Sequence, residues 1–207
     1  VGVEAMFPRL SPAIRLLIIA NVLIFGGQIL LPQFFEYYFA LHPLSSQESS
    51  DSAHFALWQL ITYGFLHASV THIFFNMFAL FMFGSDIERS MGQRKFLVYY
   101  FVCIVGAGLT QLLVMAIGIT PPADVVGASG AVFGILLAFA IAFPHRRLIV
   151  LPIPIPMPAW LFVTLYSLLE LYLGIFQTQQ GVAHFAHLGG AAAGYLLIVY
   201  WRYARHG

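Results

Sequence analysis

The chain has 207 residues, of which 60% are hydrophobic and only 8% are charged, and its formal net charge is +1. A soluble domain carries roughly 25% charged residues, so this composition excludes a water-facing globular surface and indicates an integral membrane protein. The small net charge offers no basic field for a nucleic-acid partner. The single cysteine, Cys103, excludes a disulfide framework within the chain.

Six apolar runs of about 15–23 residues approach the ~20 residues that a helix needs to cross a bilayer. In chain order they predict helices over Ile14–Leu31, Thr71–Ser85, Phe96–Gly118, Gly127–Phe143, Met157–Phe176 and Val182–Trp201. The second and fourth are short and carry glycine or polar residues, which places them inside the bundle rather than against lipid. The predicted fold class is therefore all-α membrane protein, a bundle of six transmembrane helices in a single domain, residues 1–207.

The basic residues follow one pattern along these spans. All of them fall at or before the start of the first span, between the second and third, between the fourth and fifth, or after the sixth. They are Arg9, Arg15, Arg89, Arg94, Lys95, Arg146, Arg147, Arg202 and Arg205. With six spans these segments share one face of the membrane, so the positive-inside rule predicts that both termini are cytoplasmic.

Two connections have a distinct composition. The segment Pro32–Val70 combines aromatic residues with a polar stretch, Ser45–Ser52, and predicts an amphipathic element that lies in the membrane interface. Proline occupies every second position of Pro152–Pro158, which predicts an extended cytoplasmic linker rather than a helix.

A serine between small residues begins the fourth span. The motif is Gly127-Ala128-Ser129-Gly130, and Gly130 with Gly134 forms a small-residue face on which another helix can pack. Two interpretations stay open. Ser129 is either a packing serine, or a functional one at a helix N-terminus, where unpaired N–H groups and the helix dipole stabilise a nearby oxyanion.

A histidine lies near the same non-cytoplasmic end of the sixth span, in the motif Ala186-His187-Leu188-Gly189-Gly190. Gly190 and Gly194 form a second small-residue face. If the two faces pack together, His187 comes within hydrogen-bonding reach of Ser129 and can act as its general base. The alternative is a histidine that is hydrogen-bonded only for packing.

His72 and Asn76 share one face of the second span, because they are four residues apart. Their side-chain donors could form an oxyanion hole for a tetrahedral intermediate. The alternative is that they link helices by hydrogen bonds. His67 is expected to tie down the preceding loop.

One carboxylate, Glu170, lies in the middle of the fifth span. We expect a paired or protonated structural residue that is distant from Ser129. No other carboxylate is placed to orient His187, so the sequence favours a catalytic dyad over a triad. His184 is expected to line the same cavity without taking part in the chemistry.

Together and in this order, the motifs resemble those of the rhomboid family of intramembrane proteases. The matching pieces are His67-x4-His72-x3-Asn76, Gly127-Ala128-Ser129-Gly130 with Gly134, and Ala186-His187-x-Gly189-Gly190-x3-Gly194. They fall on the second, fourth and sixth helices, as in that family, and the resemblance extends from about Trp58 to Gly194. The chain departs from the family at Trp58-Gln59, where many members have Trp-Arg.

The resemblance implies a rhomboid-like bundle in which Ser129 is the nucleophile and His187 the general base. It also implies that His72, Asn76 and the backbone N–H of Ser129 stabilise the oxyanion, and that Phe133 stacks on the catalytic histidine. Family members cleave transmembrane substrates that unwind near small residues, so a serine endopeptidase is expected here. Its expected partners are transmembrane proteins and membrane lipids, and the oligomeric state stays open.

For this mechanism we expect substrate to enter laterally past the fifth span. The short loop Gln177–Gly181 is polar and ends in glycine, and we expect it to act as a mobile cap over the cavity. A compact six-helix core favours a bacterial inner membrane. No metal and no cofactor are expected, since the metalloprotease motif His-Glu-x-x-His is absent. Two alternatives lack proteolytic activity. One is a haem-binding membrane protein with axial ligands among His72, His184 and His187, and the other is a relative that only binds transmembrane clients.

Overall fold

A computed structural model describes residues 10–44, 53–150, 153–176 and 183–204. Its elements are, in chain order, α1 (Pro12–Leu30), α2 (Pro32–Phe39), α3 (Gln59–Thr62), η2 (Tyr63–Phe65), α4 (Val70–Ala79), η3 (Leu80–Gly84), α5 (Ser85–Met91), α6 (Gln93–Ala116), α7 (Ser129–Ala142), β1 (Arg147–Val150), β2 (Ile153–Pro158), α8 (Ala159–Phe176) and α9 (His184–Tyr203). A helix lies at the position of each predicted span, and the π-helical turn η3 joins α4 to α5 within the second.

Within the described ranges, four helical segments are long and apolar enough to cross a membrane: Pro12–Leu30, Val70–Met91, Gln93–Ala116 and Ala159–Phe176. The apolar α7 is shorter, with 14 residues. The 20 residues of α9 include two histidines and three glycines. The chain is therefore a multi-pass, predominantly helical membrane protein.

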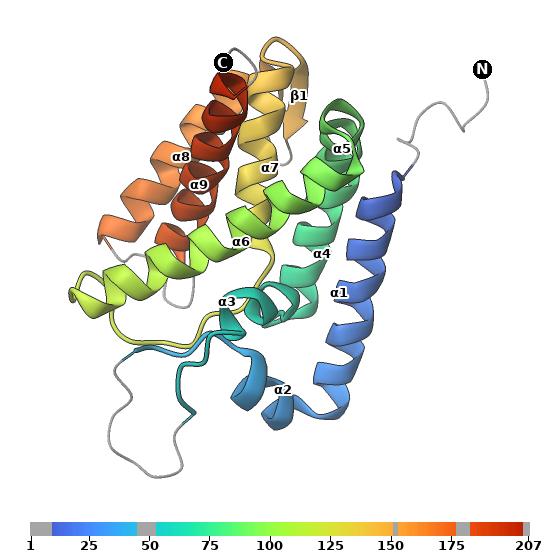
Figure 1. Cartoon of the computed structure of the whole chain (residues 1–207). Helices are drawn as coiled ribbons and strands as arrows, with labels where there is room; N and C mark the ends of the chain where they lie inside the picture. The colour runs from blue at the N-terminus through green and yellow to red at the C-terminus, as the bar shows by residue number, and fades with distance from the viewer. Residues whose placement is uncertain (1–9, 45–52, 151–152, 177–182, 205–207) are drawn as a thin grey trace.

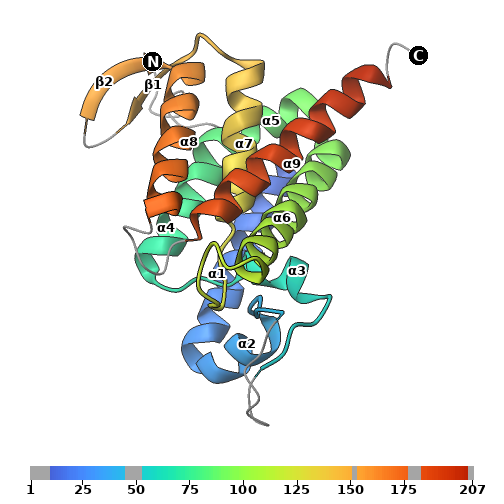
Figure 2. The same cartoon turned by 90° about the vertical axis from the view of Figure 1, so that its left-hand side faces the viewer.

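Figure 1 shows α6 crossing the middle of the molecule, with α8 and α9 on one side and α1 and α4 on the other. The first turn of α1, α5, the β1–β2 hairpin and the last turn of α9 lie toward one end of the bundle, whereas α2 and α3 lie toward the opposite end. The view in Figure 2 agrees, and it places α7 among α4, α8 and α9. The N-terminus of α7 is thereby surrounded by helices.

Close backbone approach holds α6, α7 and α9 together. A Cβ atom on Gly130 of α7 would lie 2.3 Å from the Cβ of Ala107 on α6, and one on Gly190 of α9 would lie 2.1 Å from the carbonyl oxygen of Gly130. Real side chains cannot approach so closely, so glycine is required at both positions. In a bilayer, where lipid is as apolar as leucine, this kind of contact is a main source of helix association.

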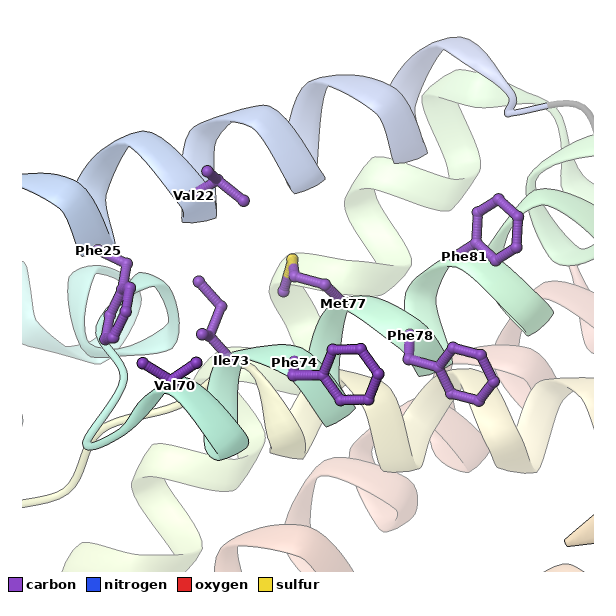
Figure 3. A pocket seen from close by; sticks show the side chains of 8 residues that line it. All are labelled: Val22, Phe25, Val70, Ile73, Phe74, Met77, Phe78 and Phe81. Carbon is purple, nitrogen blue, oxygen red and sulfur yellow. The ribbon is translucent and has the colours of Figure 1, made fainter. Parts of the chain in front are cut away.

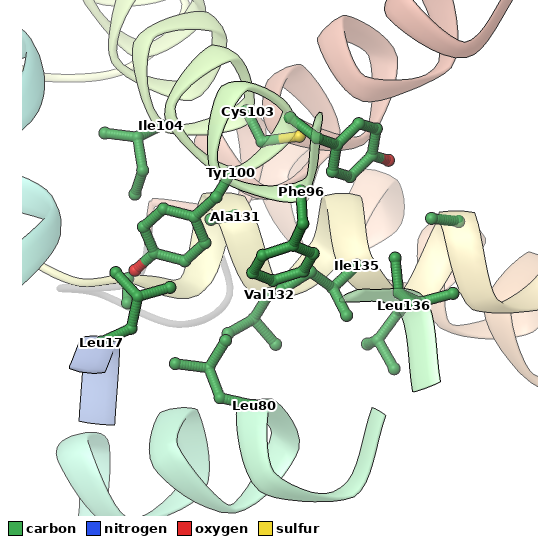
Figure 4. Close-up of a cluster of buried hydrophobic side chains, with 14 of the residues drawn as sticks. Leu17, Leu80, Phe96, Tyr100, Cys103, Ile104, Ala131, Val132, Ile135 and Leu136 are labelled. Atoms are coloured by element: carbon green, nitrogen blue, oxygen red, sulfur yellow. The ribbon is translucent and has the colours of Figure 1, made fainter. Parts of the chain in front are cut away.

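Buried side chains of α6 and α7 complete the core. Phe96 and Tyr100 of α6 and Ile135 of α7 are at most 1% exposed. Figure 4 shows these side chains meeting Leu17 of α1 and Leu80 of η3. The core therefore extends from the α6–α7–α9 contact to α1.

A carboxylate fastens α1 to α5. Glu88 accepts hydrogen bonds from the backbone N–H groups of Ala13 (3.0 Å) and Ile14 (3.1 Å), and also from the hydroxyl of Ser11. The first N–H groups of a helix have no partner within that helix, so Glu88 satisfies them and complements the positive end of the α1 dipole.

Of the two connections with a distinct composition, Pro32–Val70 contains a helix and the proline-rich segment contains a strand. Within Pro32–Val70, the aromatic residues form α2, with Phe34, Tyr37 and Tyr38 exposed, while Ser45–Ser52 lies outside the described residues. The proline-rich segment is extended as predicted, but it is not a free linker. Its residues form β2, which pairs antiparallel with β1.

An apolar groove of about 440 Å³ lies between α1 and α4. Figure 3 shows Val22 and Phe25 of α1 facing Ile73 and Met77 of α4 across it. Neither Ser129 nor His187 lines this groove, so the groove is separate from these two residues.

Candidate active site

Ser129 and His187 meet inside the bundle. The Nε2 atom of His187 lies 2.8 Å from the hydroxyl oxygen of Ser129, although the two residues are 58 positions apart in the chain. Ser129 is the first residue of α7 and His187 lies in the first turn of α9. The close contact between Gly130 and Gly190 sets the spacing of the two helices at this level.

The loop before Ser129 has a conformation that only glycine adopts easily. Gly127 has a φ angle of +131°, and its N–H donates to the carbonyl of Tyr63 at 2.9 Å. A two-residue bridge between Leu41 and Val125 joins the same loop to the segment after α2. These contacts fix the direction from which the chain enters α7, and therefore the place of the Ser129 hydroxyl.

Glu170 contacts His187, which differs from the expectation for this carboxylate. Its Oε2 atom lies 2.7 Å from Nδ1 of His187. The expectation of a residue distant from Ser129, with no carboxylate to orient His187, was therefore wrong. Because α8 runs beside α9, the middle of α8 lies level with the first turn of α9, which its position along the sequence does not reveal.

With Glu170 ionised, the contact fixes which nitrogen of His187 carries a proton. An ionised carboxylate only accepts hydrogen bonds, so Nδ1 of His187 is the donor and Nε2 keeps its lone pair for the Ser129 hydroxyl. This is the tautomer that a general base needs. Ser129, His187 and Glu170 thus form a continuous hydrogen-bonded chain from α7 through α9 to α8.

His184 contacts the same carboxylate. Its Nδ1 atom lies 2.7 Å from Oε2 of Glu170, while its other ring nitrogen, Nε2, is buried and has no partner among the described residues. The side chain is 4% exposed. It was expected beside the site, but its contact with Glu170 was not.

The ring of Phe133 stacks on His187. Their centroids are 4.5 Å apart and the planes differ by 5°, and Tyr166 of α8 lies against the other side of Phe133 at 4.8 Å. Phe133 is one turn after Ser129, so the same helix that carries the hydroxyl also supports the imidazole ring.

His72 of α4 lies near Ser129. A Cβ atom on Gly127 would be 2.8 Å from Nε2 of His72 and 3.6 Å from the hydroxyl of Ser129, so the ring and the serine border the same glycine. The backbone N–H of Ala68 donates to Nδ1 of His72 at 3.4 Å. This makes Nε2 the protonated nitrogen, a donor beside Ser129.

Asn76 has an unused donor. Its Nδ2 atom is buried and lacks a partner among the described residues, and the residue is 5% exposed. Few buried polar groups in native proteins are unpaired, so each such group needs an explanation. An amide that acquires its partner only when substrate is bound provides one.

His67 ties the loop through its backbone rather than its ring. Its N–H donates to Oε1 of Gln28 on α1 at 2.9 Å, and its carbonyl accepts from Nε2 of Gln28 at 3.4 Å. Its imidazole is buried with neither nitrogen paired among the described residues, and it packs edge-on against His72 with centroids 5.1 Å apart.

Gln59 anchors the first loop in place of the arginine that the resemblance leads one to expect. It is 1% exposed. Its Oε1 accepts from the backbone N–H groups of His42 (3.3 Å) and Ala56 (3.1 Å), and its Nε2 donates to the carbonyl of His54 (3.2 Å). A neutral amide thus satisfies three loop backbone groups without burying a charge.

Fold and site together define a multi-pass helical membrane protein with a buried Ser–His–carboxylate arrangement. Comparison with known proteins agrees: a family model of the rhomboid domain matches residues 54–204, a range that contains Ser129, His187, His72 and Asn76. The chain belongs to the rhomboid family.

Individual relatives come from several kinds of organism. The chain is 31% identical over 140 residues to Rhomboid protein 1, mitochondrial, of Saccharomyces cerevisiae, which covers 66% of this chain and 40% of that protein. It is 31% identical over 146 residues to RHOMBOID-like protein 4 of Arabidopsis thaliana, covering 68% and 33%. To Rhomboid protease AarA of Providencia stuartii it is 32% identical over 156 residues, covering 65% and 52%.

The matched region spans about a third to a half of the length of these relatives. They include a mitochondrial, a plant and a bacterial protein, so the expectation of a bacterial inner membrane stays a prediction. The loop Gln177–Gly181, expected to act as a cap, lies outside the described residues.

Proposed function

We propose that the chain is an intramembrane serine endopeptidase that cleaves transmembrane segments of other proteins. The observation that carries the proposal is the 2.8 Å contact between Nε2 of His187 and the hydroxyl of Ser129. A serine hydroxyl is a weak nucleophile, and an adjacent base that can take its proton is what activates it.

The reaction follows from the tautomer of His187. Ser129 attacks the peptide carbonyl carbon while Nε2 of His187 takes its proton, and the resulting imidazolium then gives a proton to the leaving amine. Water hydrolyses the acyl-enzyme by the same steps in reverse order. Glu170 stabilises the imidazolium and holds its ring, so it is a positioning residue, in contact with Nδ1 of His187 and not with the substrate.

The negative charge of the tetrahedral intermediate needs donors. The backbone N–H of Ser129 lies at the N-terminus of α7, where N–H groups are unpaired and the helix dipole is positive. Nε2–H of His72 and the unpaired amide of Asn76 supply two further donors. One such hydrogen bond typically contributes about 10²–10³-fold to kcat.

For the topology we propose six spans with both termini cytoplasmic. The described elements that carry basic residues support it. The first turn of α1, α5, the β1–β2 hairpin and the last turn of α9 all lie toward one end of the bundle (Figure 1). Ser129 and His187 lie in first turns that begin at the other end, where water on the non-cytoplasmic side would reach the acyl-enzyme.

Substrate would enter sideways from the lipid. The flanks of α4 and α8 support this route because they present large apolar side chains outward, among them Phe74 (59% exposed), Phe75 (62%) and Leu168 (57%). A substrate helix must then unwind, since its carbonyl groups are already hydrogen-bonded within the helix.

A serine-directed covalent probe, applied to the protein in detergent and in liposomes, tests the proposal. Wild type should be labelled, and Ser129→Ala and His187→Ala should lose labelling together with cleavage of a transmembrane reporter. Ser167→Ala and His145→Ala are matched controls on other parts of the chain and should retain both. A wild-type protein that is neither labelled nor active would favour the client-binding alternative. Labelling of Ser129→Ala at wild-type strength would exclude that residue as the nucleophile.

A further inference from the structure

Three metal-ligating side chains converge beside Ser129, and the proposed reaction uses them only in part. The Oε2 atom of Glu170 is 2.7 Å from Nδ1 of His184 and 2.7 Å from Nδ1 of His187. The ligand atoms of all three residues lie within 4.8 Å of one another, and all three residues are buried. Two imidazole nitrogens and one carboxylate oxygen are a ligand set that proteins use for zinc with an open fourth position.

His184 has no role in the proposed reaction. One hydrogen bond from Nδ1 of His187 to Glu170 is enough to orient the catalytic ring, and a second buried imidazole adds a desolvation cost. That cost is visible at Nε2 of His184, which is buried without a partner among the described residues. The only polar contact of this ring within the described residues is the carboxylate that it shares with His187.

We propose that Glu170, His184 and His187 form a binding site for a divalent transition-metal ion, with Zn²⁺ as the best match to the donors, and that the bound metal switches the protease off. The sequence predicted no metal because no single helix carries the full ligand motif. The two histidines are three residues apart on α9 and the carboxylate comes from α8. Only the packing of these two helices brings the three ligands together.

The geometry needs a small adjustment to accept the ion. Zn–N and Zn–O bonds of about 2.0–2.1 Å in a tetrahedral site place neighbouring ligand atoms roughly 3.3 Å apart, whereas the N–O distances are 2.7 Å. The ligands must therefore separate by roughly 0.6 Å. The side chain of His187 is 11% exposed, which gives the ion a path from the cavity. A dication would also compensate the buried charge of Glu170.

The bound metal inhibits the proposed protease because it changes the tautomer of His187. A metal ion on Nδ1 of His187 replaces the proton there, and in a neutral imidazole the proton is then carried by Nε2. In this form Nε2 donates to the Ser129 hydroxyl and cannot accept its proton, so the base is lost. His184 undergoes the same change, in which one proton moves from Nδ1 to Nε2 through solvent. The metal remains in its +2 state, and no bond of the protein is broken.

The inhibitory part of the proposal rests on the proposed protease function, so it is tested by activity. Zn²⁺ should reversibly inhibit the wild-type protein, and a chelator should restore the rate. For His184→Phe, which keeps an aromatic ring but removes the ligand, the inhibitory Zn²⁺ concentration should rise at least tenfold when each variant is compared with its own metal-free rate. His145 is exposed in the turn that follows α7; His145→Phe is the matched control and should remain as sensitive as wild type.

The binding part is tested without activity. Co²⁺ added to Ser129→Ala should give the intense visible absorption of a four-coordinate cobalt site, and Zn²⁺ should displace it. The band should be lost from the double variant Ser129→Ala/His184→Phe and kept in Ser129→Ala/His145→Phe. Equal Zn²⁺ inhibition of wild type and His184→Phe, or an absent or His184-independent cobalt band, would overturn the site. If the metal-free protein cleaves nothing, the protease function fails, and the cobalt spectra still decide on the site.

Discussion

The helices that carry Ser129 and His187 differ from those that carry Glu170, His72 and Asn76 in how closely they are packed. On α7 and α9, a methyl group at Gly190 would collide with the backbone of Gly130 at 2.1 Å. Of the most apolar 18-residue window, only 22% is buried on α8 and 39% on the segment Val70–Met91 that contains α4, against 50% for α6, which packs against α7 and α9. Ser129 and His187 thus belong to the tightly packed part of the bundle.

A protease that works inside a lipid bilayer has two structural requirements, and the two regions of this bundle differ in which one they suit. A proton transfer between two side chains depends on a distance of about 2.8 Å, and close backbone contact keeps that distance constant. A substrate helix can enter only if other helices move apart. The helices α4 and α8, which expose apolar side chains on their outer faces, can do so. Glu170, His72 and Asn76 lie on these two helices. If the proposed function holds, substrate entry would therefore disturb the groups proposed to orient the base and bind the oxyanion.

The strongest test of this comparison is Glu170→Gln. If Ser129 and His187 alone were sufficient for catalysis, this change would have little effect on kcat. We expect kcat to fall roughly 10²–10⁴-fold, because the amide can stabilise the wrong tautomer of His187, while KM for the transmembrane substrate changes little. Steady-state kinetics measures both, and Glu36→Gln, exposed on α2, is the control. A variant with unchanged kcat would show that the carboxylate does not position the base.

The oxyanion donors on α4 should have the next largest effect. His72→Ala and Asn76→Ala should each lower kcat by roughly 10- to 10³-fold, since each removes one hydrogen bond that forms fully in the transition state. Thermal unfolding in detergent should be little changed, and Thr71→Ala, exposed on the same turn, should be near wild type in rate. Unchanged rates in both variants and in the double variant would show that His72 and Asn76 do not stabilise the oxyanion.

The tightly packed part can be tested at Gly190. Gly190→Ala places a methyl group 2.1 Å from a backbone oxygen, so α9 must move away from α7, and the stability should fall by about 1–3 kcal/mol with loss of probe labelling. Gly26→Ala on α1, where nothing lies within 4 Å, should be neutral or stabilise by up to about 1 kcal/mol. Comparable unfolding temperatures for the two variants would contradict the difference in packing.

The smallest effect concerns pH and the loop before α4. Burial, with a smaller contribution from His72, lowers the pKa of His67 to about 3. An unfolded histidine titrates near pH 6.5, so between about pH 6.5 and 3 the unfolded state binds more protons and stability falls as the pH falls, by at most about 1.4 kcal/mol per pH unit. His67→Phe should flatten the dependence of the unfolding temperature on pH between 6 and 5. His145→Phe should leave the slope as in wild type, and an unchanged slope in His67→Phe would show that its ring does not titrate in this way.

The sequence by itself determined the membrane class, the positions of the helices and the residues of the Ser–His pair. The apolar runs give the helices, and the small-residue faces at Gly130–Gly134 and Gly190–Gly194 indicate which helices approach closely. The resemblance of its motifs to the rhomboid family also implied His72 and Phe133 beside the pair, where the structure has them; the oxyanion role of Asn76 stays a prediction.

Only the tertiary structure decided the role of Glu170 and its contact with His184. In a soluble helix, the polar face shows which way each residue points. Lipid and protein interior are equally apolar, and α8 has few polar residues, namely Thr164, Ser167 and Glu170. The rotation of α8 about its axis, and its position along α9, are therefore set by packing and not by hydrophobic periodicity. No sequence motif predicted the cluster of three ligands either, because its members come from two helices that only the packed bundle brings together.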